Sequence, residues 1–168
     1  MSTADILEIL LSHDQWATEQ ILDSCSKLTE AQFHQSFPIG PGSLHDTITH
    51  MLGAMQTWTQ TLSGKQLGSR VDQDGKKRTL AELQALAKSC YREFALEAHQ
   101  RPLDEMVSRQ RAGKTFQYSR AVVVAHVATH GMHHRAQCLN MLRHLDVKPL
   151  PPSSVAEWSR MAAEPPGN

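Results

Sequence analysis

The stretch that decides the fold is residues 43–64, which read SLHDTITHMLGAMQTWTQTLSG. Ser43 followed by Asp46 three positions later is typical of a helix start, because the hydroxyl can accept a hydrogen bond from the first turn. Apolar residues then recur at helical spacing: Leu44, Ile48, Met51, Leu52, Met55, Trp58 and Leu62. Gly64 follows where a helix commonly ends. The segment is therefore predicted to be a helix that buries one face.

Two further segments carry start signals and helical spacing of the same kind. We expect a first helix over about residues 4–26, with Thr3 as its N-cap. Thr79 with Glu82 forms a capping box that opens another helix. This helix should end before Pro102, since the residue preceding a proline disfavours helical geometry. Both segments are predicted to be long helices.

The C-terminal part of the chain is also predicted to be helical. A long helix should start at Ser119 and be ended by the proline-rich residues 149–152. Ser154 with Glu157 is expected to cap a last, short helix. Residues 163–168 are expected to form a frayed tail.

The remaining segments are predicted to be connections. Residues 37–42 are rich in proline and glycine, and residues 65–78 are polar, so both are expected to be loops. Residues 106–118 give a weak signal for a hairpin that turns near Gly113. With four long helices and almost no strand, the predicted fold is an all-α four-helix bundle with a short C-terminal helix, one domain over residues 1–168.

Composition limits the classes of partner. The 168 residues include 17 lysines and arginines and 17 aspartates and glutamates, so no excess of positive charge favours nucleic acid or an anionic membrane. No apolar run approaches the roughly 20 residues that span a bilayer. The N-terminus, MSTADILEIL, lacks the basic segment and cleavage site of a signal peptide. We therefore expect a cytoplasmic protein that binds neither nucleic acid nor membrane.

The three cysteines agree with that expectation. Cys25, Cys90 and Cys138 are odd in number and far apart, which argues against a disulfide framework and for a reducing compartment. Cys25 and Cys90 are interpreted as small buried hydrophobes. Cys138 lies four residues after His134, so a role as a metal ligand stays open for it.

Four of the ten histidines fall within residues 126–137, which read HVATHGMHHRAQ. His130 and His134 are about 40° apart on a helix and one turn apart along it, so both can reach one metal ion. His126 lies one turn earlier on the same side, whereas His133 points about 60° away from His130. The pair lacks the glutamate of a zinc-peptidase H-E-x-x-H motif, which excludes that class.

A catalytic zinc site usually has three protein ligands, so the pair needs a third. His50, on the flank of the apolar stripe at 43–64, is the best candidate, and His45 lies on the opposite flank. The alternative is that these histidines only fill the core. The remaining four stand among polar residues and are expected to be solvated: His13, His34, His99 and His144.

These two motifs resemble those of a known family. Residues 43–58, where His50 precedes Trp58 by eight positions, are similar to the second helix of the DinB/YfiT-like family of metal-dependent enzymes. Residues 126–137, followed by Met-Leu-Arg-His-Leu at 141–145, are similar to its last long helix. The resemblance implies a bundle in up-down-down-up order, frequently a homodimer. It also implies that His50, His130 and His134 bind a divalent ion, nickel or zinc.

The expected chemistry follows from three neutral imidazoles and an open coordination position. Such an ion activates water for hydrolysis, or a thiol for transfer to a small electrophile. Relatives that are thiol S-transferases using low-molecular-weight thiols favour the second by analogy. His126, His133 and Gln137 are the candidates to form hydrogen bonds to the metal-binding histidines and so orient them. Two alternatives stay open: a non-catalytic metal-binding dimer of the stress response, closed by Cys138, and a bundle that binds no metal.

Overall fold

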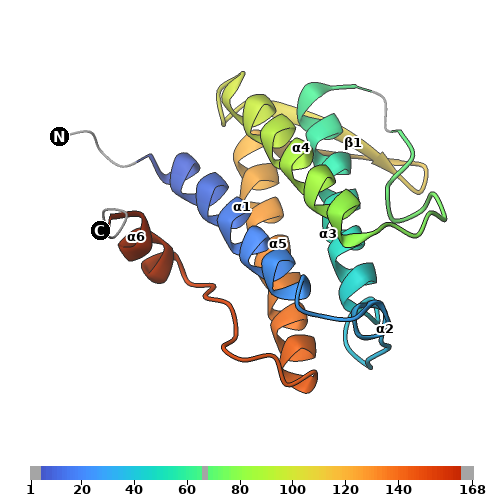
Figure 1. Ribbon diagram of the computed structural model, residues 1–168. Helices are drawn as coiled ribbons and strands as arrows, with labels where there is room; N and C mark the ends of the chain where they lie inside the picture. Colours follow the sequence, from blue (N-terminus) through green and yellow to red (C-terminus); the bar gives the residue numbers. More distant parts are fainter. Residues whose placement is uncertain (1–4, 66–67, 164–168) are drawn as a thin grey trace.

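The computed structural model describes residues 5–65 and 68–163, and within them it has six helices and one β-hairpin (Figure 1). The elements are α1 (Ile6–Cys25), α2 (Glu30–Phe33), α3 (Leu44–Ser63), α4 (Leu80–His99), β1 (Met106–Arg111), β2 (Lys114–Ser119), α5 (Arg120–His144) and α6 (Val155–Ala163). The prediction of a mostly helical chain is confirmed. The single-turn helix α2, which Thr29 and Gln32 cap reciprocally, was not predicted.

The local signals explain most of the helix ends. Ser43 accepts a hydrogen bond from the backbone of Asp46 at 3.0 Å, and Gly64 ends α3 with a left-handed φ of 68°. The carboxylate of Asp46 contacts the ring of His45 and not the backbone of Ser43, so only one of the two hydrogen bonds of a capping box is present. Thr79 and Glu82 form a complete capping box, as predicted.

Two predicted helix ends are wrong. Asp5, not Thr3, is the N-cap of α1, because its carboxylate accepts a hydrogen bond from Leu7 in the first turn. Thr3 itself lies outside the described residues. Helix α5 ends at His144, before the prolines, since Asp146 takes a left-handed φ of 57°.

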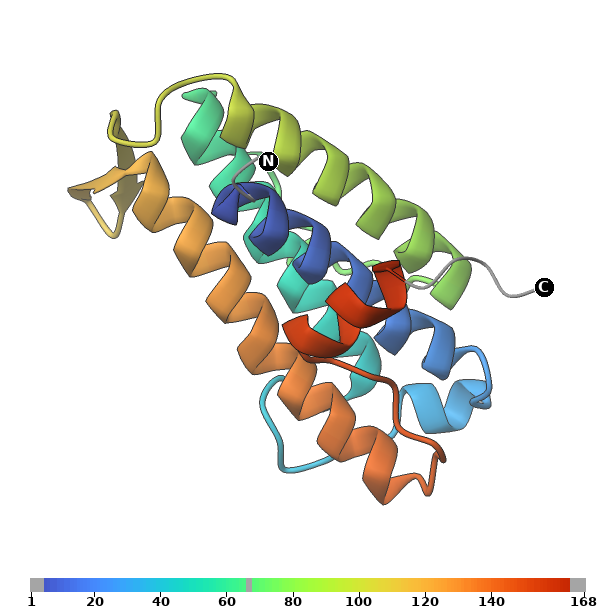
Figure 2. The same cartoon turned by 90° about the vertical axis from the view of Figure 1, so that its left-hand side faces the viewer.

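The four long helices form a bundle in up-down-down-up order. Helix α1 packs against α4 and α5, and α3 packs against the same two helices (Figures 1 and 2). Helix α1 runs in the same direction as α5 (Figure 2), and the directions of α3, α4 and α5 follow from contacts at their ends. Leu62 of α3 and Glu97 of α4 both bond Arg120 at the start of α5, so α3 and α4 run parallel to each other and antiparallel to α5. The order that the family resemblance implied is confirmed.

The parallel pair needs a connection that returns along the bundle. Its described part, residues 68–79, is a loop, as predicted, and it inserts Val71 into the hydrophobic core. This connection brings polar side chains beside the middle of α3, far from either end of that helix. A chain with a short turn between α3 and α4 would leave that side of α3 open.

The short strands extend one end of the bundle. β1 and β2 pair antiparallel from Met106↔Ser119 to Arg111↔Lys114, and they turn at Ala112 and Gly113, both at positive φ. The predicted hairpin is thus confirmed. It lies beside α3 and α5, where β1 contacts α3 and β2 contacts α5 (Figure 1).

The C-terminal segment corrects one histidine prediction. Helix α6 lies across α1 (Figure 2), and His13 is buried beneath it, with its Nε2 atom 3.0 Å from the carbonyl oxygen of Ser153 and its ring beside Trp158. His13 is therefore not solvated as predicted. Local sequence polarity did not show that a distant segment folds over this turn. None of the helices in the described ranges is long and apolar enough to span a membrane.

Among the described residues, Arg120 is the largest fully buried side chain. It donates to the carbonyl of Leu62 at 2.8 Å and to that of Glu97, so one guanidinium satisfies the C-terminal ends of α3 and α4. Helix C-termini carry partial negative charge, which favours a cation there. Arg120 therefore links the start of α5 to the C-terminal ends of α3 and α4.

Replacing this arginine should be costly. In Arg120→Met, two buried carbonyls lose their donor, and we expect the free energy of unfolding to fall by about 2–3 kcal/mol in urea denaturation. The exposed Arg101 is the matched control, and Arg101→Met should change it by less than about 0.5 kcal/mol. Equal stabilities of the two variants would contradict this account.

Candidate metal centre

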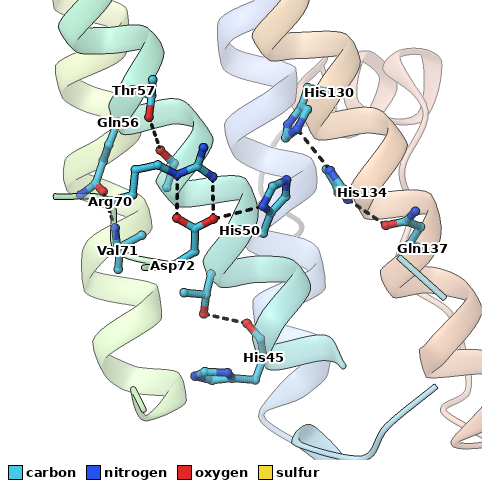
Figure 3. Close-up of polar contacts among 12 residues, drawn as sticks. His45, His50, Gln56, Thr57, Arg70, Val71, Asp72, His130, His134 and Gln137 are labelled. Atoms are coloured by element: carbon cyan, nitrogen blue, oxygen red, sulfur yellow. Dashed lines mark hydrogen bonds and ion pairs between the residues drawn. The ribbon is translucent and has the colours of Figure 1, made fainter. Parts of the chain in front are cut away.

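Three histidines from two antiparallel helices meet inside the bundle. His50 comes from the middle of α3, and His130 and His134 come from successive turns of α5 (Figure 3). The ring centroids are 5.4 Å apart for His50 and His130, 4.8 Å for His50 and His134, and 4.4 Å for His130 and His134. The structure thus brings together the three residues that the sequence analysis selected.

The ring nitrogens are spaced for a shared ion. One ligand nitrogen from each ring lies within 4.8 Å of the other two. The Nε2 atoms of His130 and His134 are 3.2 Å apart. Two nitrogens bound to one tetrahedral zinc at roughly 2.0–2.1 Å would be separated by about 3.3 Å. At such a distance two lone pairs repel each other unless a proton or a metal ion lies between them.

The environment of His130 and His134 favours their neutral form. Burial, together with the neighbouring His134 and His50, lowers the pKa of His130 to about 4. Burial also lowers the pKa of His134. A neutral imidazole is the form that binds a metal, so no proton has to be displaced from the pair near neutral pH.

Gln137 orients His134. Its Oε1 atom lies 2.8 Å from His134 Nδ1, which must donate to it, so the lone pair of His134 is on Nε2, facing His130. The amide of Gln137 in turn donates to His133 Nε2 at 3.0 Å. Gly40 makes room for this side chain, since a Cβ atom there would lie 2.2 Å from Gln137 Oε1.

Asp72 orients His50 in the same way. Its Oδ2 atom lies 3.1 Å from His50 Nδ1, which leaves Nε2 of that ring free to bind (Figure 3). Arg70 holds the carboxylate with two hydrogen bonds of 2.7 and 2.5 Å, and these, with the His50 contact, lower the pKa of Asp72. A carboxylate behind a histidine is the arrangement typical of metal sites.

Asp72 was not among the predicted site residues, because it lies in a segment whose sequence indicates only a polar loop. One signal for it was present, namely Gly53 in the middle of α3. A Cβ atom on Gly53 would lie 2.4 Å from Asp72 Oδ1, so the glycine permits the loop to approach. A glycine inside a helix often marks such a close contact.

Comparison with known proteins agrees with these motifs. The DinB family matches the chain over residues 1–160. The chain belongs to the DinB family. No curated protein matches it. Family membership and the three-histidine group together make this DinB-family chain a candidate for binding a metal ion.

The other histidines of this DinB-family chain are not members of the group of three. His126 packs its ring on Trp58 and His130, and it makes no hydrogen bond to the three central rings. His45 is buried and bonds Asp46 and the backbone of Arg78. Three predicted solvated residues remain at least partly exposed: His34, His99 and His144.

Two residues near the histidine cluster serve the core of this DinB-family bundle. Cys138 is fully buried in the hydrophobic core and is not a member of the group that could hold an ion. Burial raises the pKa of its thiol well above the ordinary value, which disfavours the thiolate. Cys25 and Cys90 are buried in the same core, as predicted. Arg135 forms a buried ion pair with Asp14 of α1.

A cleft of about 630 Å³ opens beside two of the three histidines. His50, His130 and His126 line it on one side, and Trp58, Phe116 and Tyr118 contribute aromatic surface. The volume is in the range of small-molecule sites. The DinB-family chain therefore has a candidate metal centre that borders a cleft.

Proposed function

We propose that this DinB-family chain is an enzyme that uses one divalent ion, nickel or zinc, bound by His50, His130 and His134. The observation that carries the proposal is that three imidazoles, two of them oriented by Asp72 and Gln137, lie within reach of one another beside a cleft that His50 and His130 line. An ion held by three imidazoles with an open position acts as a Lewis acid, lowering the pKa of a thiol or a water that it binds.

Neighbouring residues of the chain would orient two of the histidines that bind the ion. Asp72 and Gln137 hold the Nδ1–H groups of His50 and His134, which keeps both rings in the tautomer with Nε2 available. Arg70 neutralises Asp72, so the carboxylate remains a hydrogen-bond acceptor and not a competing ligand.

Of the two reaction classes, thiol transfer is the better supported. No aspartate or glutamate is among the described residues that line the cleft, so hydrolysis lacks a carboxylate general base. Transfer of an activated thiol to a small electrophile needs no such base once the thiol proton has left to solvent. We infer that the substrate pair is a low-molecular-weight thiol and a small electrophile.

The first test is the metal content of untagged protein, measured by elemental mass spectrometry before and after incubation with zinc or nickel. We expect close to one ion per chain. The metal-loaded protein is then mixed with N-acetylcysteine and 1-chloro-2,4-dinitrobenzene. In this reaction the sulfur–carbon bond forms, chloride leaves and the thiol proton passes to buffer. Chelator-treated protein is the control.

The outcomes separate the candidates. A conjugation rate that is lost with chelator and restored by metal supports the proposal. Stoichiometric metal without metal-dependent turnover over a panel of thiols and electrophiles would favour a non-catalytic metal-binding protein. A chain that takes up no metal would contradict both. The expected homodimer stays a prediction, for which analytical ultracentrifugation gives a direct measurement.

Asp72 offers a sharper test of the site. Asp72→Asn keeps the shape of the side chain but removes the charge that orients His50, and we expect the affinity for zinc to fall about 10- to 100-fold. Competition with a chromogenic chelator measures this change. Asp74, which pairs with Arg78 on the same connection, is the matched control. Asp74→Asn should leave zinc affinity unchanged, and equal losses in both variants would show a general effect on the loop.

A further inference from the structure

The β-hairpin carries its charges on an unusual face. By register, Val107, Arg109 and Arg111 share a face with their partners Tyr118, Phe116 and Lys114. Four of these residues line the cleft: Arg109, Arg111, Phe116 and Tyr118. The opposite face is uncharged, with Met106, Ser108, Gln110, Thr115, Gln117 and Ser119. An ordinary surface hairpin would place its charged side chains on the face turned away from the rest of the protein.

These cations have no counter-charge in the described part of the chain. Neither Arg109 nor Arg111 takes part in any of its ion pairs. Arg111 directly opposes Lys114 across the hairpin, a like-charge pair that destabilises the strand pairing. The cleft-lining residues include no carboxylate. Arg70, the third arginine of the cleft, differs because Asp72 already neutralises it.

Arg109 is the most constrained of the three. Its guanidinium carbon lies 4.4 Å from the centroid of the Trp58 ring, which fixes the group against the cleft wall. Its Nε atom is buried and has no hydrogen-bond partner. Because Nε is inaccessible to solvent, as is Nε of the core residue Arg120, a ligand in the cleft would bind the terminal nitrogens of the Arg109 guanidinium. Burial, and to a lesser extent the nearby Arg111, lowers the pKa of Arg109.

The surroundings of the arginines are aromatic. Trp58 packs edge-to-face against Tyr118 at 5.6 Å and against His126 at 4.8 Å, and Phe116 lies opposite Arg109 across the strands. Phe116 lines the cleft and is 41% exposed. Apolar surface and unpaired guanidinium groups therefore lie within a single cleft, which also contains His50 and His130.

We propose that Arg109 and Arg111 bind the oxyanion of a small substrate, a carboxylate or phosphate group, whose apolar body lies against Trp58, Phe116 and Tyr118. This deepens the proposed function, since the anion-bearing molecule would be the electrophile that reacts beside the metal centre. A guanidinium matches the planar, two-oxygen geometry of either group. The two arginines would hold the charged end of the molecule and leave its other end toward the histidines.

Binding of defined probes tests the proposal. Isothermal titration calorimetry is done with trans-cinnamate, its neutral isostere trans-cinnamamide, and phenyl phosphate, each on zinc-loaded and on chelator-treated protein. We expect the two anions to bind at least about tenfold more tightly than the amide, with or without zinc. In the Arg109→Gln/Arg111→Gln double variant, anion binding should weaken about tenfold to a hundredfold, while amide binding stays the same.

The matched control is Arg92→Gln, an exposed arginine of α4 outside the cleft, which should bind all three probes as the wild type does. Circular dichroism confirms that each variant is folded. Tighter binding of phenyl phosphate than of cinnamate, with the same dependence on the arginines, would support the site and identify phosphate as its preferred group.

Two results would overturn the proposal. One is equal anion binding by the double variant and the wild type, and the other is anion binding that needs zinc and ignores the arginines. A different result, the absence of bound metal, would contradict the proposed metal-dependent function. If the protein binds no metal but still binds cinnamate through the two arginines, the anion site is supported and the metal-dependent enzyme is not.

Discussion

His50→Ala and His130→Ala will each purify with far less metal than the wild type, falling from about one ion per chain to less than about a tenth of that. The reason is that the proposed site has three histidine ligands, one from α3 and two from α5. Loss of any one of them leaves at most two imidazoles, and a zinc site usually needs three protein ligands. Elemental mass spectrometry on untagged protein, loaded with zinc and then desalted, measures the ratio directly.

Two other histidines serve as controls for that experiment. His99→Ala removes an exposed imidazole from α4 and should leave the metal content unchanged. His126→Ala removes a ring that contacts His130 without being one of the three, and it should retain most of the metal. Loss of metal in His130→Ala alone would remove His50 from the proposed ligand set. Loss in His126→Ala alone would place the ion one turn earlier on α5.

Arg135→Met should destabilise the protein by about 3–5 kcal/mol, the largest effect on stability that we expect. Arg135 and Asp14 are both nearly inaccessible to solvent, and the guanidinium also donates to the hydroxyl of Thr18 at 3.2 Å. That hydroxyl lies 2.7 Å from the hydroxyl of Tyr91, so the network joins α1, α4 and α5. Without Arg135 the carboxylate is left buried and unpaired. Urea denaturation at 25 °C measures the loss.

A double variant separates charge from packing. In Asp14→Leu/Arg135→Met both charged groups are gone, and we expect much of the lost stability to return, because buried pairs can be replaced by hydrophobic residues at little cost. Arg143, exposed on the same helix, is the matched control, and Arg143→Met should change stability by less than about 0.5 kcal/mol. A double variant as unstable as Arg135→Met would mean that shape, not unpaired charge, causes the loss.

The sequence by itself determined the helices and the central histidines. Capping residues and apolar spacing act within one or two turns, so Ser43, Thr79 and Gly64 mark helix ends that the structure retains. His130 and His134 lie on one face because helical geometry fixes residues four positions apart. The choice of His50 needed its place on the stripe of the neighbouring helix and the resemblance to the DinB family.

Only the tertiary structure decided what surrounds those histidines. Asp72 reaches His50 because the parallel arrangement of α3 and α4 forces their connection back along the bundle, and Gly53 leaves space for it. Arg135 directly follows His134 in the chain, yet the turn of α5 directs it to Asp14, more than a hundred residues away in the chain. His13 is buried by α6 for the same reason. Contacts between segments far apart in the chain depend on how the helices pack, so the spacing of residues within one segment cannot predict them.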